Sequence, residues 1–277
     1  MQDENKQEKL NALVASAVSQ EMTRPLSLLS INRAYLWSRL GCDNPGADER
    51  VKQALDGIGL ASSHIERLWR NCTDLFDCAQ GQLIPRKEPV DLCEVLDQIE
   101  EEQEYIQHAT GVQLEIHHPE EEVCVKTDSA MVEKVLLNLL SNALRLTESG
   151  GKVIVNLTEN HSGVQLSVQD FCGGMAEEQV SVLCGTQDNA VEPKRGIGIG
   201  LHLCREFCRL LDWEPVVRTN NKGSTITLRV PITEILPAGQ LVFRSNTASE
   251  EQRRDTRQAR IRLELGSVPG LEAYWTA

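Results

Sequence analysis

The sequence has few aromatic residues, no excess of positive charge and no long apolar run. Phe, Trp and Tyr make up 4% of its 277 residues, so Leu, Val, Ile and Ala must fill the core. The net charge of −13 at pH 7 disfavours nucleic-acid and anionic membrane surfaces as partners, although it leaves room for a local nucleotide site. No apolar run approaches the ~20 residues of a membrane helix, and the first residues lack a signal-peptide pattern. We expect a cytoplasmic chain without a membrane span.

The cysteines also lack the spacing of a zinc site or a disulfide framework. There are nine of them, an odd number, and no two are arranged as CxxC. No histidine or second cysteine pair lies at zinc-finger spacing. We therefore expect reduced thiols, most of them buried, as is usual in the cytoplasm.

Two stretches, residues 10–40 and 51–75, carry apolar residues at helical spacing. The segment GCDNPGAD (41–48) separates them and is rich in turn formers. Two helices of ~30 residues would each be ~45 Å long, and an isolated pair could not bury both apolar faces. Residues 1–83 are thus expected to form a helical hairpin that pairs with a second copy in a four-helix bundle.

The composition changes after GQLIPRKEP (81–89), which reads as a linker. Beyond it we expect a helix from Asp91 to about His108, the strand VQLEIHH, a helix over 128–146, the strands KVIVNLT and VQLSVQD, a helix after residue 200, and the strand STITLRV. This α+β pattern predicts an α/β sandwich over residues 84–236, with helices on one sheet face. In residues 237–277, QLVFRS and ARIRLEL alternate like strands, so we expect a hairpin appendage without site chemistry.

The run GIGIG (196–200) opens the helix LHLCREFCRLL. Glycine at positions 196, 198 and 200 lets the backbone approach a phosphate, and a helix N-terminus offers unpaired N–H groups. A plain flexible loop is the alternative interpretation, because short glycine patterns recur by chance.

Three polar residues, Asn138, Asn142 and Arg145, share one stripe of the apolar helix LLNLLSNALRLT. Buried amides need partners, and hydrated Mg²⁺ with a phosphate chain would satisfy all three side chains. A solvent-facing stripe with accidental spacing is the alternative.

Asp170 begins the segment DFCGGM, directly after a predicted strand. A carboxylate at a strand end can accept a hydrogen bond from the adenine amine, and the glycines leave room for the ring. The alternative is an ordinary turn in which Asp170 bonds its own backbone.

Together and in this order, these motifs resemble the Bergerat-type ATP-binding domain of sensor histidine kinases. NLLSNALRLT resembles their asparagine box, DFCGGM and GIGIGL their glycine boxes, and KGSTITLRVP their closing strand. Upstream, VSQEMTRPL resembles the phosphoacceptor box. The resemblance implies ATP and Mg²⁺ as cofactors: Asn142 on the metal with Asn138 beside it, Arg145 on the phosphates, Asp170 on the adenine amine with Thr225 acting through a water, and Gly174, Gly196, Gly198 and Gly200 shaping the site and its lid.

The chain departs from the family at several of these positions. Gln20 occupies the place of the phosphorylated histidine, and an amide nitrogen cannot serve as the nucleophile. Glu21, in the general-base position, is kept, but it has no imidazole beside it. Cys172 replaces the first glycine of the adenine loop, and Leu146 replaces an aromatic residue. The six histidines elsewhere lack an acceptor-box context.

The resemblance and its departures predict a degenerate histidine-kinase-like protein of a two-component pathway. It would bind ATP, form a homodimer, and act with a response regulator or a partner kinase. One alternative is a kinase of serine or threonine on a partner, as in anti-sigma-factor kinases. Another is a dimeric scaffold that no longer binds ATP, which Cys172 and Leu146 favour and GIGIGL opposes.

Overall fold

The computed structural model divides into two compact units, residues 1–83 with 265–277, and residues 84–264. The structure describes residues 26–27, 29–31, 33–34, 36, 49–160, 163–185, 199–237, 260–261, 263–266, 268 and 270–271. Within these residues, no helix combines the length and the apolar character that crossing a membrane requires.

The first unit contains the long helix α2 (Glu49–Ala79), which spans 31 residues. The described residues between 26 and 36 are also helical. Their contacts with α2 include a pair of hydroxyl oxygens, those of Ser30 and Ser62, which lie 3.2 Å apart, and the Arg33 guanidinium, which lies over Gly59. A Cβ at Gly59 would be 2.1 Å from Arg33 Cζ, so the missing side chain makes room for this arginine.

The second unit is built on a five-stranded sheet with the order β2-β4-β5-β7-β6. The strands β2 and β4 are parallel, and the other neighbours are antiparallel. A separate two-stranded sheet pairs β1 with β3. The strands are β1 (Glu88–Asp91), β2 (Gln113–His117), β3 (Cys124–Thr127), β4 (Lys152–Asn160), β5 (Gly163–Asp170), β6 (Glu214–Asn220) and β7 (Gly223–Arg229).

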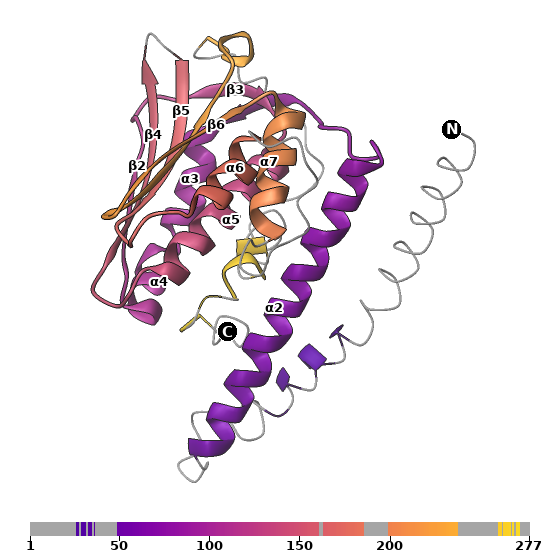
Figure 1. The fold of residues 1–277 in the computed structure, drawn as a ribbon, viewed down its shortest axis with the longest axis vertical. Coiled ribbons are helices and arrows are strands. Elements are labelled where there is room, and N and C mark those ends of the chain that lie inside the picture. The colour runs from indigo at the N-terminus through magenta and orange to yellow at the C-terminus, as the bar shows by residue number, and fades with distance from the viewer. Residues whose placement is uncertain are drawn as a thin grey trace, which may run out of the picture. The chain divides into compact units, whose positions relative to one another are not determined.

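Helices cover one face of this sheet (Figure 1). Alternate residues in the first two thirds of β4 are buried, namely Val153, Val155 and Leu157, because successive side chains of a strand point to opposite faces. The α/β sandwich expected from the sequence is confirmed. The helices are α3 (Leu92–Glu100), α4 (Gln103–Thr110), α5 (Ser129–Leu146), α6 (Glu177–Cys184), α7 (Ile199–Leu211) and the 3₁₀ helix η1 (Ile232–Glu234).

The structure corrects two of the expected elements. The helix expected from Asp91 to His108 is two helices, α3 and α4, which are separated at Glu101 and Glu102. The segment 81–89, expected to be a linker, ends in β1. This strand has only one buried residue, Val90, so its pairing with β3 leaves almost no apolar pattern in the sequence.

The described part of the C-terminal segment also differs from its expected form. Residues 260–261 and 263–265 are helical, so the strand expected over ARIRLEL is wrong, while QLVFRS lies outside the described residues. Helical spacing places Arg260 and Glu264 on one side. There they pair with the consecutive residues Glu133 and Lys134 of α5, at 2.8 and 2.5 Å.

Candidate nucleotide-binding site

The helix α5 carries the three polar residues singled out in the sequence, and their exposure increases along the helix. Asp128 starts this helix by accepting hydrogen bonds from the Ala130 and Met131 N–H groups. Asn138 is fully buried, and its Nδ2 donates to the Lys134 carbonyl at 2.9 Å. Asn142 is half-buried and Arg145 is exposed. A purely solvent-facing stripe is therefore excluded for Asn138, whereas Asn142 and Arg145 are accessible at the surface of the helix.

Asp170 is the last residue of β5, and a turn fixes its carboxylate. Its Oδ1 accepts a hydrogen bond from the Cys172 N–H at 3.0 Å. This is the turn that the simpler interpretation of the sequence anticipated. The second oxygen, Oδ2, has no hydrogen-bond partner among the described residues. The turn orients the carboxylate and leaves one oxygen for a ligand, so the two interpretations are compatible.

Cys172 joins the Asp170 loop to the end of α5. Its thiol donates to the Thr147 hydroxyl at 3.3 Å, and Thr147, the C-cap of α5, donates to the Ala143 carbonyl at 2.8 Å. These bonds hold the carboxylate loop against the same helix end that carries Asn142 and Arg145. No sequence pattern indicates this contact, because Cys172 is notable in the sequence only as the replacement of a glycine.

Gly174 fixes the other side of the loop against the β6–β7 hairpin. Its φ of +79° is in the left-handed region, and a Cβ there would lie 2.2 Å from the Asn220 carbonyl oxygen. The next residue, Met175, donates its N–H to the Thr219 hydroxyl at 2.7 Å. Only glycine fits this close approach between the loop and the hairpin.

Thr225 lies in β7, between strands β5 and β6. It stands opposite Gln169 of β5 and Arg218 of β6, one residue along from the pair formed by Asp170 and Ser224. Its side chain is half-buried. The sheet register therefore places Thr225 beside the end of β5, although not directly opposite Asp170.

The glycine-rich run is described only where it enters α7. Gly200 is half-buried in the first turn of this helix, whereas Gly196 and Gly198 lie outside the described residues. The helix α7 packs against α5, and the Cys204 thiol lies 3.8 Å from the Val135 carbonyl oxygen. Gln20 and Glu21, at the acceptor box, also lie outside the described residues.

Two charge pairs on α5 were not found by sequence reasoning. Arg260 Nη1 lies 2.8 Å from Glu133 Oε2, and Lys134 Nζ lies 2.5 Å from Glu264 Oε1. Glu264 is 2% exposed. The partners are 127 and 130 residues apart in the chain, so no local pattern could have indicated them. They fix the first half of the helix whose second half carries Asn142 and Arg145.

Hydrogen bonds thus connect two parts of the site. One is the end of α5, which carries an amide and a guanidinium group, and the other is the loop whose carboxylate has one unpaired oxygen. Residues 127–234 match the family described as "Histidine kinase-, DNA gyrase B-, and HSP90-like ATPase". This segment is a histidine-kinase-type ATPase domain. The match begins at the last residue of β3 and ends with η1, so it includes α5, the Asp170 loop and α7.

Several histidine kinases resemble the chain over longer stretches. Histidine protein kinase DivJ of Caulobacter vibrioides is 32% identical over 126 residues, which cover 44% of this chain and 21% of that protein. Adaptive-response sensory kinase SasA of Nostoc sp. is 28% identical over 208 residues, 71% of this chain and 51% of that protein. The chain thus spans about half or less of these relatives' length.

One solved structure has a fold similar to that of this chain. Full-length ShkA, crystallised in complex with AMPPNP, superposes with a TM-score of 0.60 at 20% identity. The superposition covers 81% of this chain and 46% of that one. At this identity, the likeness shows the fold alone.

Proposed function

We propose that this protein is a histidine-kinase-like component of a two-component pathway that binds ATP with Mg²⁺ but does not phosphorylate itself at the usual place. The observation that carries the proposal is the Asp170 loop held against the C-terminal end of α5. The loop supplies the Asp170 carboxylate, which would bind the adenine amine. The helix end supplies the Asn142 amide for the metal and the Arg145 guanidinium for the phosphates. The matches to histidine kinases support the same assignment.

The residues present fit a hydrated magnesium ion. Asn142 offers an amide oxygen, a ligand type that Mg²⁺ accepts, and it has no hydrogen-bond partner among the described residues. Asn138 would lie beside Asn142 without binding the ion directly, since its own amide is bonded within α5. Arg145 is exposed and would bind phosphate oxygens. When bound, the ion would neutralise phosphate charge.

Gln20 is the reason to propose a degenerate kinase. The chain keeps the segment VSQEMTRPL, but an amide nitrogen has a delocalised lone pair and cannot attack the γ-phosphorus. Glu21, next to it, would have no imidazole proton to remove. The protein would then signal through nucleotide-dependent conformation, with a response regulator as the proposed partner.

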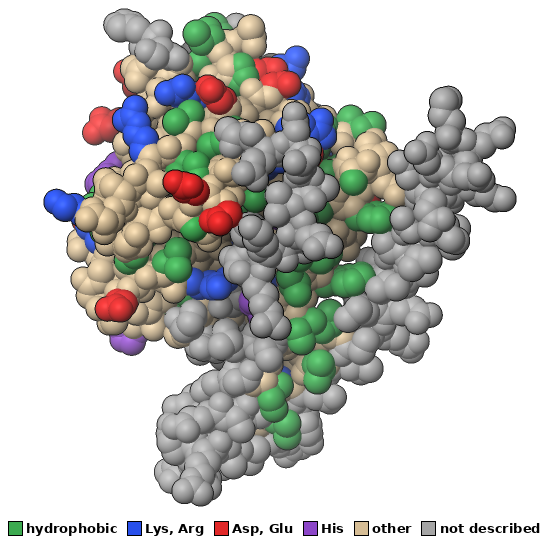
Figure 2. All heavy atoms as spheres, viewed as in Figure 1, with side chains coloured by type: hydrophobic (Ala, Val, Ile, Leu, Met, Phe, Trp, Pro, Cys, Tyr) green, Lys and Arg blue, Asp and Glu red, His purple; other side chains and the backbone are tan. Residues whose placement is uncertain are grey.

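The helical unit is proposed to dimerise. Three apolar residues of α2, Ile58, Ile65 and Leu68, are 39–44% exposed and recur on one side of the helix. Figure 2 shows hydrophobic side chains along this helix. Ser30 contacts Ser62, and Arg33 contacts Gly59, which comes earlier in α2. The two helical segments are therefore antiparallel, as in a hairpin. A second copy covering the exposed stripe would complete a four-helix bundle.

The thiols fit a cytoplasmic setting for this pathway. All eight described cysteines are free. Burial raises the pKa of Cys208 to about 12 and, together with the charge of Asp91, that of Cys93 to about 11. Such thiols are protonated and unreactive at neutral pH.

Calorimetric titration with Mg-ATP tests the proposed site, using Asp170→Asn. A hydrogen bond to a charged group contributes about 1.5–3 kcal/mol, so we expect the variant to bind at least about tenfold more weakly. Asp212→Asn is the matched control: Asp212 is exposed, its φ of +62° suits asparagine, and it lies outside the site. Equal affinities of wild type and Asp170→Asn would refute the assignment of Asp170 to adenine.

A further inference from the structure

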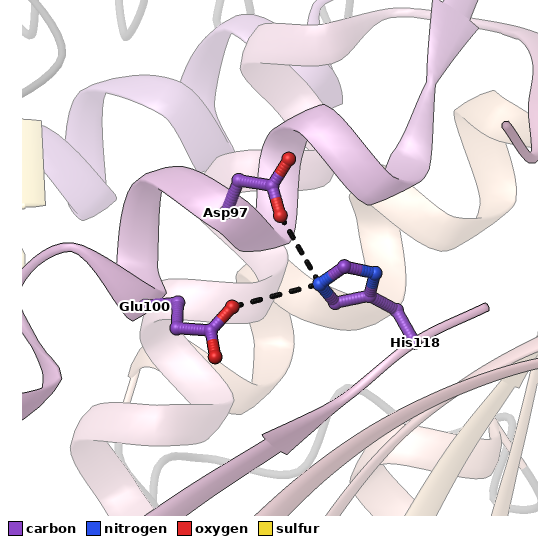
Figure 3. Close-up of side chains that lie close together, drawn as sticks. All are labelled: Asp97, Glu100 and His118. Atoms are coloured by element: carbon purple, nitrogen blue, oxygen red, sulfur yellow. Dashed lines mark ion pairs between the residues drawn. The ribbon is translucent and has the colours of Figure 1, made fainter. Parts of the chain in front are cut away.

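Three side chains outside the nucleotide-binding site converge on one point of the ATPase domain unit. Asp97 and Glu100 lie one turn apart on α3, and His118 follows the last residue of β2 (Figure 3). His118 Nε2 is 3.1 Å from Asp97 Oδ1 and 3.6 Å from Glu100 Oε2. One ligand atom from each residue lies within 4.8 Å of the other two. Both carboxylates are thus directed at the same ring nitrogen.

The orientation of the His118 ring is fixed from its other nitrogen. His118 Nδ1 lies 3.0 Å from the Pro119 carbonyl oxygen, a group that can only accept a hydrogen bond. Nδ1 must therefore carry a proton. The ion pairs with Asp97 and Glu100 place a second proton on Nε2, and a metal ion that displaced this proton would meet a lone pair already directed between the two carboxylates. Histidines that ligate metals are oriented in the same way, by donating their second N–H to a carbonyl or carboxylate.

The segment that carries His118 is tied to the start of α3. The Val123 N–H donates to Asp91 Oδ1 at 3.1 Å, and the Leu92 N–H donates to the Val123 carbonyl at 3.0 Å. The Cys93 thiol, one turn before Asp97, donates to the Glu121 carbonyl at 3.4 Å. These bonds hold the two sides of the cluster together without a ligand, so its geometry is prepared in advance.

We propose that Asp97, Glu100 and His118 form a binding site for a divalent transition-metal ion, with Zn²⁺ as the preferred occupant. Two carboxylates and one neutral imidazole carry a charge of −2, which a divalent cation would balance. One nitrogen and two oxygen ligands are a set that zinc accepts, with water in the remaining position. The imidazole favours zinc over Mg²⁺ and Ca²⁺, which prefer oxygen ligands. The ion would join α3 to the end of β2.

The site is accessible from solvent, which makes direct titration possible. The side chains of Asp97 and Glu100 are 57% and 47% exposed, and that of His118 is 20% exposed. Substitutions at the two acidic positions therefore remove little packing. The site shares no residue with the proposed nucleotide site, so the two assignments can fail separately.

Calorimetric titration of the full chain with Zn²⁺, without nucleotide and with Mg²⁺ in excess, tests the proposal. We expect one ion to bind the wild type, and His118→Ala to bind at least about tenfold more weakly, the loss typical even of a supporting residue. His117→Ala is the matched control, because His117 is the neighbouring histidine and pairs with Glu115 instead. It should bind zinc as the wild type does.

Two additions make the outcome decisive. Asp97→Asn, an exposed and conservative change, should also weaken zinc binding, while Asp170→Asn should leave it unchanged. Zinc should raise the melting temperature of the wild type and of His117→Ala, but not that of His118→Ala. Absence of zinc binding by the wild type, or equal affinity in His118→Ala and His117→Ala, would overturn the site, including the case in which cysteines bind the ion.

Discussion

The polar side chains in the two halves of α5 differ in their hydrogen-bond and ion-pair partners. In the first half, Glu133 and Lys134 bond to Arg260 and Glu264, so the chain itself supplies their partners. In the second half, Asn142 and Arg145 have no side-chain hydrogen bond among the described residues. Asn138 lies between them, buried and bonded back to the Lys134 carbonyl. The first half of the helix is thus bonded within the fold, whereas the second half carries the side chains that we propose bind the nucleotide.

Removing a partner in the first half should have the largest effect on stability. Glu264→Ala removes one member of a buried ion pair, in which the Lys134 side chain is only 15% exposed and that of Glu264 2%. Breaking a buried pair in this way costs about 3 kcal/mol of unfolding free energy, which urea denaturation would measure. Arg260→Ala should cost less, about 1 kcal/mol, because this pair is only part-buried: the Arg260 side chain is 47% exposed, so water can reach the Glu133 oxygen that it contacts. A smaller loss for Glu264→Ala than for Arg260→Ala would contradict this ranking.

The next test compares Asn138 with Arg145 on the same helix. Asn138→Ala removes a buried, bonded amide and should lower the unfolding free energy by about 2 kcal/mol. Arg145→Ala removes an exposed side chain and should change stability by less than about 0.5 kcal/mol, while weakening Mg-ATP binding about tenfold. Urea denaturation and calorimetry on both variants separate the effects. If Arg145→Ala destabilised the fold and bound ATP normally, the division of α5 into two halves would be wrong.

The smallest effect is expected from His202 on α7, the helix that packs against α5. Burial, followed by the charge of Arg205, lowers its pKa below the ordinary value of 6.5. The unfolded chain then binds a proton more readily than the fold does, so stability should decline as the pH falls through 6.5 and level off below the folded pKa. His202→Gln should reduce this decline, as followed by urea denaturation at several pH values. An unchanged pH profile would show that His202 is not the group responsible.

The sequence predicted those features that depend on neighbouring residues. Asp91 caps α3 as expected, since its carboxylate accepts the Cys93 N–H, and α5 covers the residues expected from its apolar pattern. Asp170 was expected at a strand end, and it is the last residue of β5. Each of these depends on spacing within one or two turns or on a single strand, which a sequence displays directly.

What the sequence did not predict depends on contacts between distant segments. The Cys172–Thr147 bond joins residues 25 positions apart, and the Arg260–Glu133 pair joins residues 127 positions apart. The strand β3 and the helical form of residues 260–261 and 263–265 were missed for the same reason: partners elsewhere in the chain stabilise them. The intrinsic preferences of these residues do not by themselves predict either the strand or the helix.

The central claim, that the protein binds ATP without phosphorylating itself, can be tested in a single measurement. Wild-type protein is incubated with Mg²⁺ and ATP labelled at the γ-phosphate, and the retained label is counted before and after denaturation at alkaline pH, where phosphohistidine survives. We predict that the native protein retains label and that denaturation releases all of it. Acid-labile label that remains on the denatured chain, or no label on the native protein, would contradict the claim.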